Sequence, residues 1–137
     1  EDTEYAKLFQ QMLESRFREK IAALSSKSLL ELQMLQLEGS PEHRAFAALA
    51  LGDRPEPQAT EALLFLLRDG LPVVRGAAAW CLAQRPGKHI STQLVQLLED
   101  EDRRVRVLAQ SALVRRFGED LGLDPAAWRG RLEILEG

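Results

Sequence analysis

The sequence has few of the residues on which most protein chemistry depends. One cysteine, Cys81, and two histidines, His43 and His89, occur in 137 residues. An internal disulfide is therefore impossible, and a cysteine-built zinc site does not fit. Aromatic residues make up only 6% and the net charge is −3, so the chain as a whole does not attract nucleic acid. No apolar run approaches the ~20 residues needed to cross a bilayer, and we expect no membrane insertion of this segment.

Short enzyme motifs are also absent from the sequence. It contains no Gly-rich phosphate loop, no His-Glu-x-x-His and no nucleophile elbow. Cys81 is expected to be a small buried side chain rather than a reactive thiol, because it lies in an apolar helical stretch. We expect His43 to pack and His89 to be solvated. The sequence therefore predicts no catalytic residue, no cofactor and no metal site, and we do not expect an enzyme.

What the sequence does have is an internal period. Hydrophobic residues make up 45% of the chain. Many of them, together with several charged residues, recur at one constant interval in the sequence. This interval is the distance from Arg44 to Arg75 and again from Arg75 to Arg106. The positions that share this spacing are Arg44, Arg75 and Arg106; Glu38, Asp69 and Asp100; Leu32, Leu63 and Leu94; Leu35, Leu66 and Leu97; Ala47, Ala78 and Ala109; Leu51, Leu82 and Leu113. A regular period of this length is typical of repeat proteins.

Each period contains two helices. Leu63 and Leu66 lie at helical spacing in the first, and Gly70 and Pro72 then end that helix and begin another. The second helix carries its own apolar stripe over residues 72–84. Because a single helix pair cannot bury such a stripe alone, successive pairs should stack into a right-handed α-α solenoid.

We predict an all-α fold with one domain over residues 1–137 and eight helices. About three repeats, within residues 28–120, stand between an N-terminal capping helix in residues 1–27 and a C-terminal cap in residues 121–137. The expected helices span residues 3–24, 28–38, 41–52, 58–68, 72–84, 89–99, 103–117 and 125–135.

Two segments carry a family resemblance. Residues 69–82 read DGLPVVRGAAAWCL and residues 100–113 read DEDRRVRVLAQSAL. They resemble the HEAT repeat and, more narrowly, the short bacterial HEAT-like repeat of phycobilisome lyases. The resemblance covers about residues 28–120 and implies an armadillo-type superhelix that serves as a scaffold or adaptor.

The resemblance also implies a charged hydrogen bond between the turn of one repeat and a helix of its neighbour. Such a bond suits an aspartate and an arginine, because the guanidinium is a rigid fork of donors that meets two carboxylate oxygens. The first repeat fits less well, since His43 replaces the valine that precedes the arginine in the other repeats. The matching residues are Asp69, Asp100, Arg75 and Arg106, with Glu38 and Arg44 as the less regular pair.

By the same resemblance, the second helix of each pair lines a concave groove. We predict a non-catalytic protein–protein interaction module that binds a partner peptide or helix there. An exposed aromatic residue with arginines nearby has the composition of an interface hot spot, and the small Gly76 and Ala77 would leave a depression beside Trp80. The expected partner-binding residues are Phe46, Leu49, Val73, Ala77, Trp80, Gln84, Arg103, Arg104, Val107, Leu108 and Arg115.

Several alternatives stay open at this point. Trp80 can instead fill space left by its small neighbours, and the first helix can lie across the groove. The arginine-rich end of the groove suggests binding to a nucleic-acid backbone, although the acidic residues 99–102 weaken its field and Arg106 is expected to pair with Asp100. The family resemblance further suggests a lyase-like or chaperone role for a tetrapyrrole-bearing protein. The chain begins at Glu1 rather than Met, as expected of a processed or excised piece; the cytoplasm is favoured as its compartment and the periplasm stays open.

Overall fold

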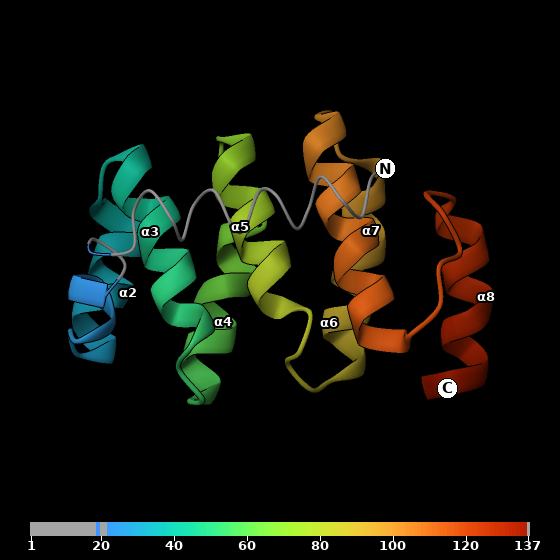
Figure 1. The fold of residues 1–137 in the computed structure, drawn as a ribbon, viewed down its shortest axis with the longest axis horizontal. Coiled ribbons are helices and arrows are strands. Elements are labelled where there is room, and N and C mark those ends of the chain that lie inside the picture. Colours follow the sequence, from blue (N-terminus) through green and yellow to red (C-terminus); the bar gives the residue numbers. More distant parts are fainter. Residues whose placement is uncertain (1–18, 20–21, 137) are drawn as a thin grey trace.

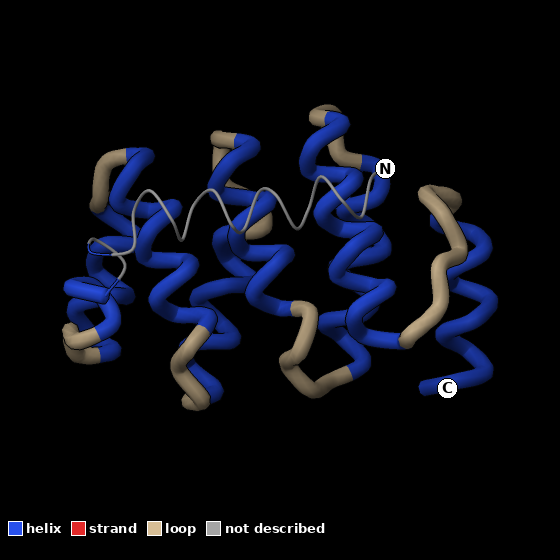
Figure 2. Tube along the Cα trace, in the orientation of Figure 1, coloured by secondary structure: helices blue, strands red, loops and turns tan. Residues whose placement is uncertain are grey.

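The structure is a computed structural model that describes residue 19 and residues 22–136. The predicted first helix, and the possibility that it crosses the groove, lie largely outside these residues. Within them the chain consists of helices and loops without a strand (Figure 2). The elements are α2 (Leu29–Glu38), α3 (Pro41–Gly52), α4 (Pro57–Leu66), α5 (Pro72–Leu82), α6 (Lys88–Gln96), the 3-10 helix η1 (Leu97–Glu99), α7 (Arg103–Phe117) and α8 (Pro125–Glu136).

Local capping residues explain where these helices begin. Ser28 starts α2 with a capping box, in which its hydroxyl accepts the N–H of Glu31 at 3.2 Å and its own N–H reaches the Glu31 carboxylate at 3.0 Å. A proline stands in the first turn of α3, α4 and α5. Helix α7 ends at Phe117 and is capped by Gly118, whose φ of 76° is the left-handed conformation that glycine adopts readily.

The helices form two layers along the long axis of the molecule (Figure 1). Helices α3, α5 and α7 make one layer, in which α3 packs against α5 and α5 against α7, while α2, α4 and α6 stand in the other layer. Sequential packing of helix pairs is the arrangement of a small α-α solenoid. The predicted all-α repeat fold is confirmed.

The repeated apolar positions form the core. Leu32, Leu63 and Leu94, one in each repeat, have no exposed surface. Leu51, Leu82 and Leu113, which recur with the same period on the second helices, are equally buried. Residues one period apart in the sequence therefore occupy equivalent positions in the core, because each large side chain lies at the same place between the two layers.

The C-terminal helix α8 closes one end of the array. It packs against α6, and its Trp128 is completely buried. The indole Nε1 of Trp128 donates to the carbonyl oxygen of Gly122 at 2.8 Å, so the one polar atom of this large side chain is satisfied. Its ring centroid lies 6.3 Å from that of Phe117, at the end of α7.

Candidate functional site

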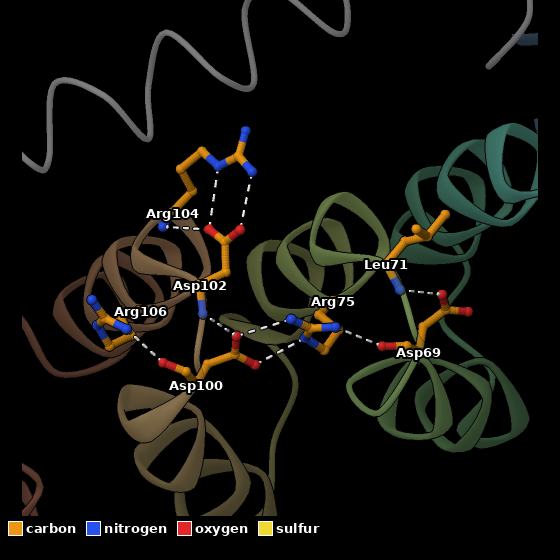
Figure 3. Close-up of polar contacts among 7 residues, drawn as sticks. All are labelled: Asp69, Leu71, Arg75, Asp100, Asp102, Arg104 and Arg106. Atoms are coloured by element: carbon orange, nitrogen blue, oxygen red, sulfur yellow. Dashed lines mark hydrogen bonds and ion pairs between the residues drawn. The ribbon is translucent and has the colours of Figure 1, made fainter.

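Arginine–aspartate forks join neighbouring repeats. Arg75 donates from Nε and Nη2 to the two carboxylate oxygens of Asp100, at 2.9 and 3.0 Å (Figure 3). Arg44 makes the same contact with Asp69 at 2.7 and 3.1 Å. Both pairs span 25 residues, from the second helix of one repeat to the turn of the next. The fork thus fixes the spacing between successive second helices, α3, α5 and α7.

Each fork also organises the turn around it. The third arginine nitrogen donates to a backbone carbonyl, as Arg75 Nη1 does to Asp69 at 2.8 Å. The carboxylate of Asp100 also accepts the N–H of Asp102 at 2.9 Å, two residues on, and Asp69 accepts that of Leu71 at 3.0 Å (Figure 3). One aspartate therefore holds both its own turn and the arginine of the preceding repeat.

The predicted contacts of Arg44 and Arg106 have different outcomes. Arg44 lies in the repeat that departs from the family pattern at His43, and its fork with Asp69 has the same geometry as that of Arg75. Arg106 was expected to pair with Asp100, but it donates to the carbonyl oxygen of that residue at 2.6 Å (Figure 3). The reason is that each carboxylate faces the preceding repeat, so the arginine in its own repeat reaches only the backbone.

The ion pair shifts the pKa of Asp69. Burial alone would raise this pKa, but hydrogen bonds from Arg44 and from the N–H of Leu71, together with the positive charge of Arg44, lower it below the ordinary value. The pKa of Arg44 is raised, chiefly by its hydrogen bonds to Asp69. Both groups are therefore charged at neutral pH.

This shift predicts a pH dependence of stability. A carboxylate with a lowered folded-state pKa stabilises the fold fully above its ordinary pKa of about 3.9, and the contribution is lost as the pH falls through the folded-state pKa. We expect Asp69→Asn to cost roughly 2 kcal/mol at pH 7 and clearly less at pH 3, measured by urea unfolding at both pH values. A cost that is equal at pH 7 and pH 3 would contradict the charged pair.

A second set of arginines binds the opposite ends of the second helices. Arg85 donates to the carbonyl oxygen of Leu51 at 2.7 Å and to Thr60 Oγ1 at 3.3 Å. Arg116 repeats these contacts one period later, on Leu82 O at 3.5 Å and on Ser91 Oγ at 2.7 Å. Carbonyl groups at a helix C-terminus lack intrahelical partners, and these guanidinium groups supply donors.

This second set of arginines was not predicted from the sequence. Arg54, Arg85 and Arg116 are also one period apart in the sequence, so the period itself was the signal that could have found them. Arg54 differs in its partners: it donates to Lys27 O at 2.8 Å and pairs with Glu56 at 3.3 Å. Neighbouring repeats are thus joined at both ends of their second helices.

A cavity of about 600 Å³ opens where the second helices end. Residues from the last turns of α3, α5 and α7 and from the loops after α3 and α5 form its wall. Four of them, Leu49, Trp80, Gln84 and Arg115, belong to the predicted partner-binding set. The full lining is Leu49, Gly52, Asp53, Arg54, Pro55, Trp80, Cys81, Gln84, Arg85, Pro86 and Arg115.

Trp80 and Arg115 both line this cavity and contact each other. The guanidinium carbon of Arg115 lies 4.1 Å from the centroid of the Trp80 ring, within the range of a cation–π contact. Nη1 of Arg115 also donates to the carbonyl oxygen of Trp80 at 3.1 Å. Only 8% of Trp80 is exposed, so the expectation of an exposed aromatic residue is wrong, and most of this side chain is packed, as in the alternative. Arg115 as a whole is exposed to solvent, but part of its guanidinium is covered, and this partial burial is the main cause that lowers its pKa, although the nearby Cys81 opposes the shift.

Other predicted site residues differ in exposure. Val73, Gln84, Arg103 and Arg104 are exposed, and Leu49 is half-buried. Five apolar residues of the predicted partner-binding set are buried, so as folded they offer a partner little surface. These are Phe46, Ala77, Trp80, Val107 and Leu108.

The expected depression beside Trp80 is filled. A Cβ atom built on Gly76 would lie 2.6 Å from Cδ1 of Leu108, so the α7 side chain occupies the space that the missing side chain leaves. Glycine at this position permits the close approach of α5 and α7. The predicted depression is therefore absent, and Leu49, Trp80, Gln84 and Arg115 of the predicted set instead line the cavity at the helix ends.

The arginines of the predicted basic end do not gather in one place. Arg104 stands in the first turn of α7 and Arg115 in its last turn. Eleven residues of helix separate them by about 16 Å along the axis. Arg104 is also paired with Asp102 at 3.0 Å, and the pKa of Asp102 is lowered to about 2, mainly by hydrogen bonds from Arg104.

Metal-binding clusters and membrane-spanning helices are the next features of the described residues. Residue 19 and residues 22–136 contain no group of three or more histidine, cysteine, aspartate or glutamate side chains placed to hold a metal ion. Among the helices of these residues, none combines the length and the apolar character that crossing a membrane requires.

The repeat geometry agrees with the comparison to known families. Residues 30–114 match the family described as HEAT repeats, which is the stretch that contains both forks. The chain belongs to the HEAT repeat family. HEAT repeat domains commonly serve as protein-interaction scaffolds and are typically non-catalytic. The curated proteins gave no match, and the narrower phycobilisome-lyase type stays a prediction.

Proposed function

We propose that this HEAT repeat domain is a non-catalytic module that binds a partner peptide or helix at the cavity beside Trp80. The observation that carries the proposal is the cavity itself. It is lined by Trp80 and Leu49 and by Arg115 at one helix end, whose guanidinium lies over the Trp80 ring. Tryptophan and arginine are the residues most enriched at interface hot spots, especially in pockets.

The position of the cavity supports the same proposal. It is built from three successive repeats, so its shape depends on the spacing that the arginine contacts fix. Leu49, Trp80 and Arg115 stand on helices α3, α5 and α7, which holds their relative positions before a partner arrives. Such preorganisation lowers the entropic cost of binding.

The two alternatives have less support. A phosphate backbone needs several cations along one track, whereas Arg104 and Arg115 stand at opposite ends of α7. A chromophore-related role would show as a coloured or fluorescent complex when the protein is mixed with a tetrapyrrole, and it rests on the family resemblance alone.

We test the proposal by selecting binders from a library of 12-residue peptides against the whole chain. Trp80→Ala should weaken the selected peptides by about 30-fold, which corresponds to about 2 kcal/mol for a hot spot. Gln84→Ala changes an exposed residue of the same cavity wall and should weaken them less. Fluorescence polarisation gives the dissociation constants, and circular dichroism shows whether each variant is folded.

Phe65→Ala is the matched control. Phe65 is an exposed aromatic residue on α4, in the other layer, and its loss should leave the dissociation constants unchanged. If Phe65→Ala weakens binding while folded Trp80→Ala and Gln84→Ala do not, the cavity is not the binding site.

A further inference from the structure

The cavity holds more positive charge than its carboxylates balance. Of its three arginines, Arg54 is paired with Glu56 at 3.3 Å. Arg85 and Arg115 donate only to carbonyl and hydroxyl oxygens, and neither forms an ion pair with a carboxylate of the described residues. Asp53, on the cavity wall, is exposed to solvent.

Arg115 has more N–H donors than it uses among the described residues. A guanidinium group carries five N–H bonds, and Arg115 uses one of them among the described residues, on the carbonyl oxygen of Trp80. Burial lowers its pKa, and no carboxylate acts to raise it. The neutral carbonyl group therefore compensates the positive charge of Arg115 only in part. An anionic group bound at the same place would be stabilised by that charge.

We infer that the cavity accepts the carboxylate of an aspartate or glutamate in the partner segment, bound by Arg115 and stabilised by the charge of Arg85. This inference rests on the proposed function and specifies the chemistry of the partner. An apolar residue next to the acidic one in the partner would lie against Leu49 and Trp80, which line the same cavity.

A carboxylate suits this cavity better than a phosphate group. The C-terminal ends of α3, α5 and α7 contribute to its wall, and helix C-termini carry partial negative charge. Together with Asp53, they repel a phosphate monoester, whose charge is close to −2 at neutral pH, more than a carboxylate of charge −1. The edge of the guanidinium still offers the paired donors that a carboxylate binds.

The test uses the whole chain and the same library of 12-residue peptides. The selected peptides should be enriched in aspartate and glutamate. Changing the acidic residue of the best peptide to its amide should weaken binding at least tenfold, and Arg115→Gln should do the same to the acidic peptide. Arg115→Gln should also reduce the salt dependence of binding, since the charge pair is lost.

Arg68→Gln is the matched control. Arg68 is exposed on the turn after α4, where it donates to Gln93 at 3.5 Å, so the substitution changes the net charge equally without touching the cavity. It should alter binding by less than twofold. Equal losses from Arg115→Gln and Arg68→Gln would overturn the inference, because net charge alone would then explain the preference.

Other results separate this inference from the proposed function. Peptides that need Trp80 but show neither acidic enrichment nor sensitivity to Arg115→Gln would overturn the carboxylate site and leave the interaction module standing. Calorimetric binding of inorganic phosphate that Arg115→Gln abolishes, without acidic enrichment, would also overturn it. If no peptide is selected at all, both proposals fail.

Discussion

Asp100→Ala is expected to lower the free energy of unfolding by about 3–5 kcal/mol, as for other buried ion pairs that lose one partner. Asp100 and Arg75 have side chains only 9% exposed, so removal of the carboxylate leaves a guanidinium largely buried without its counter-charge. The substitution also removes the acceptor for the N–H of Asp102 in the turn before α7. Urea unfolding followed by circular dichroism measures the change.

An exposed ion pair provides the control for this prediction. Arg131 and Glu119 are 2.6 Å apart, but their side chains are 38% and 36% exposed, and Glu119→Ala should cost less than about 1 kcal/mol. The double variant Arg75→Met with Asp100→Leu should recover much of the loss, because it leaves no unpaired charge. If Asp100→Ala costs no more than Glu119→Ala, the fork does not hold the repeats together.

Trp128→Ala should destabilise the chain by about 3–5 kcal/mol, as for other large buried aromatic residues. Trp128 is fully buried and satisfies the carbonyl oxygen of Gly122, so its loss creates a cavity and leaves a polar atom without its donor. Because α8 packs against α6, amide hydrogen exchange should accelerate in both helices. Urea unfolding gives the free energy, and exchange followed by mass spectrometry gives the location.

Ile134→Ala is the control on the same helix. Ile134 is 75% exposed, and a substitution at such a surface position usually changes stability by less than about 0.5 kcal/mol. An effect of Trp128→Ala that is as small as that of Ile134→Ala would show that α8 does not stabilise the array.

Helix positions could be predicted because their signals are local. Ser28 and the proline at each of positions 41, 57 and 72 start helices by their own geometry, within one residue of the prediction. Helix ends were less accurate. The helix expected over residues 89–99 becomes 3-10 after Gln96, and α4 stops at Leu66, where the N–H of Leu67 is shared among several carbonyl groups.

The site was only partly predictable, because its contacts join residues far apart in sequence. Arg115 and Arg116 are neighbours in the chain, yet Arg115 stacks on Trp80 in the cavity and Arg116 donates to the carbonyl oxygens that follow α5. The two side chains point in different directions around the axis of α7, and this decides which groups each of them contacts. Whether Leu108 fills the space above Gly76 depends likewise on the distance between two helices, which the sequence period does not specify.

Hydrogen–deuterium exchange of the whole chain, with and without a selected peptide, tests most directly whether partners bind at the cavity. We expect slower exchange at the C-terminal ends of α3 and α5 and in the loops that follow them, over residues 49–55 and 80–86, with α2 and α4 unchanged. Protection confined to α2 and α4, with none in residues 80–86, would contradict the cavity as the binding site of this HEAT repeat domain.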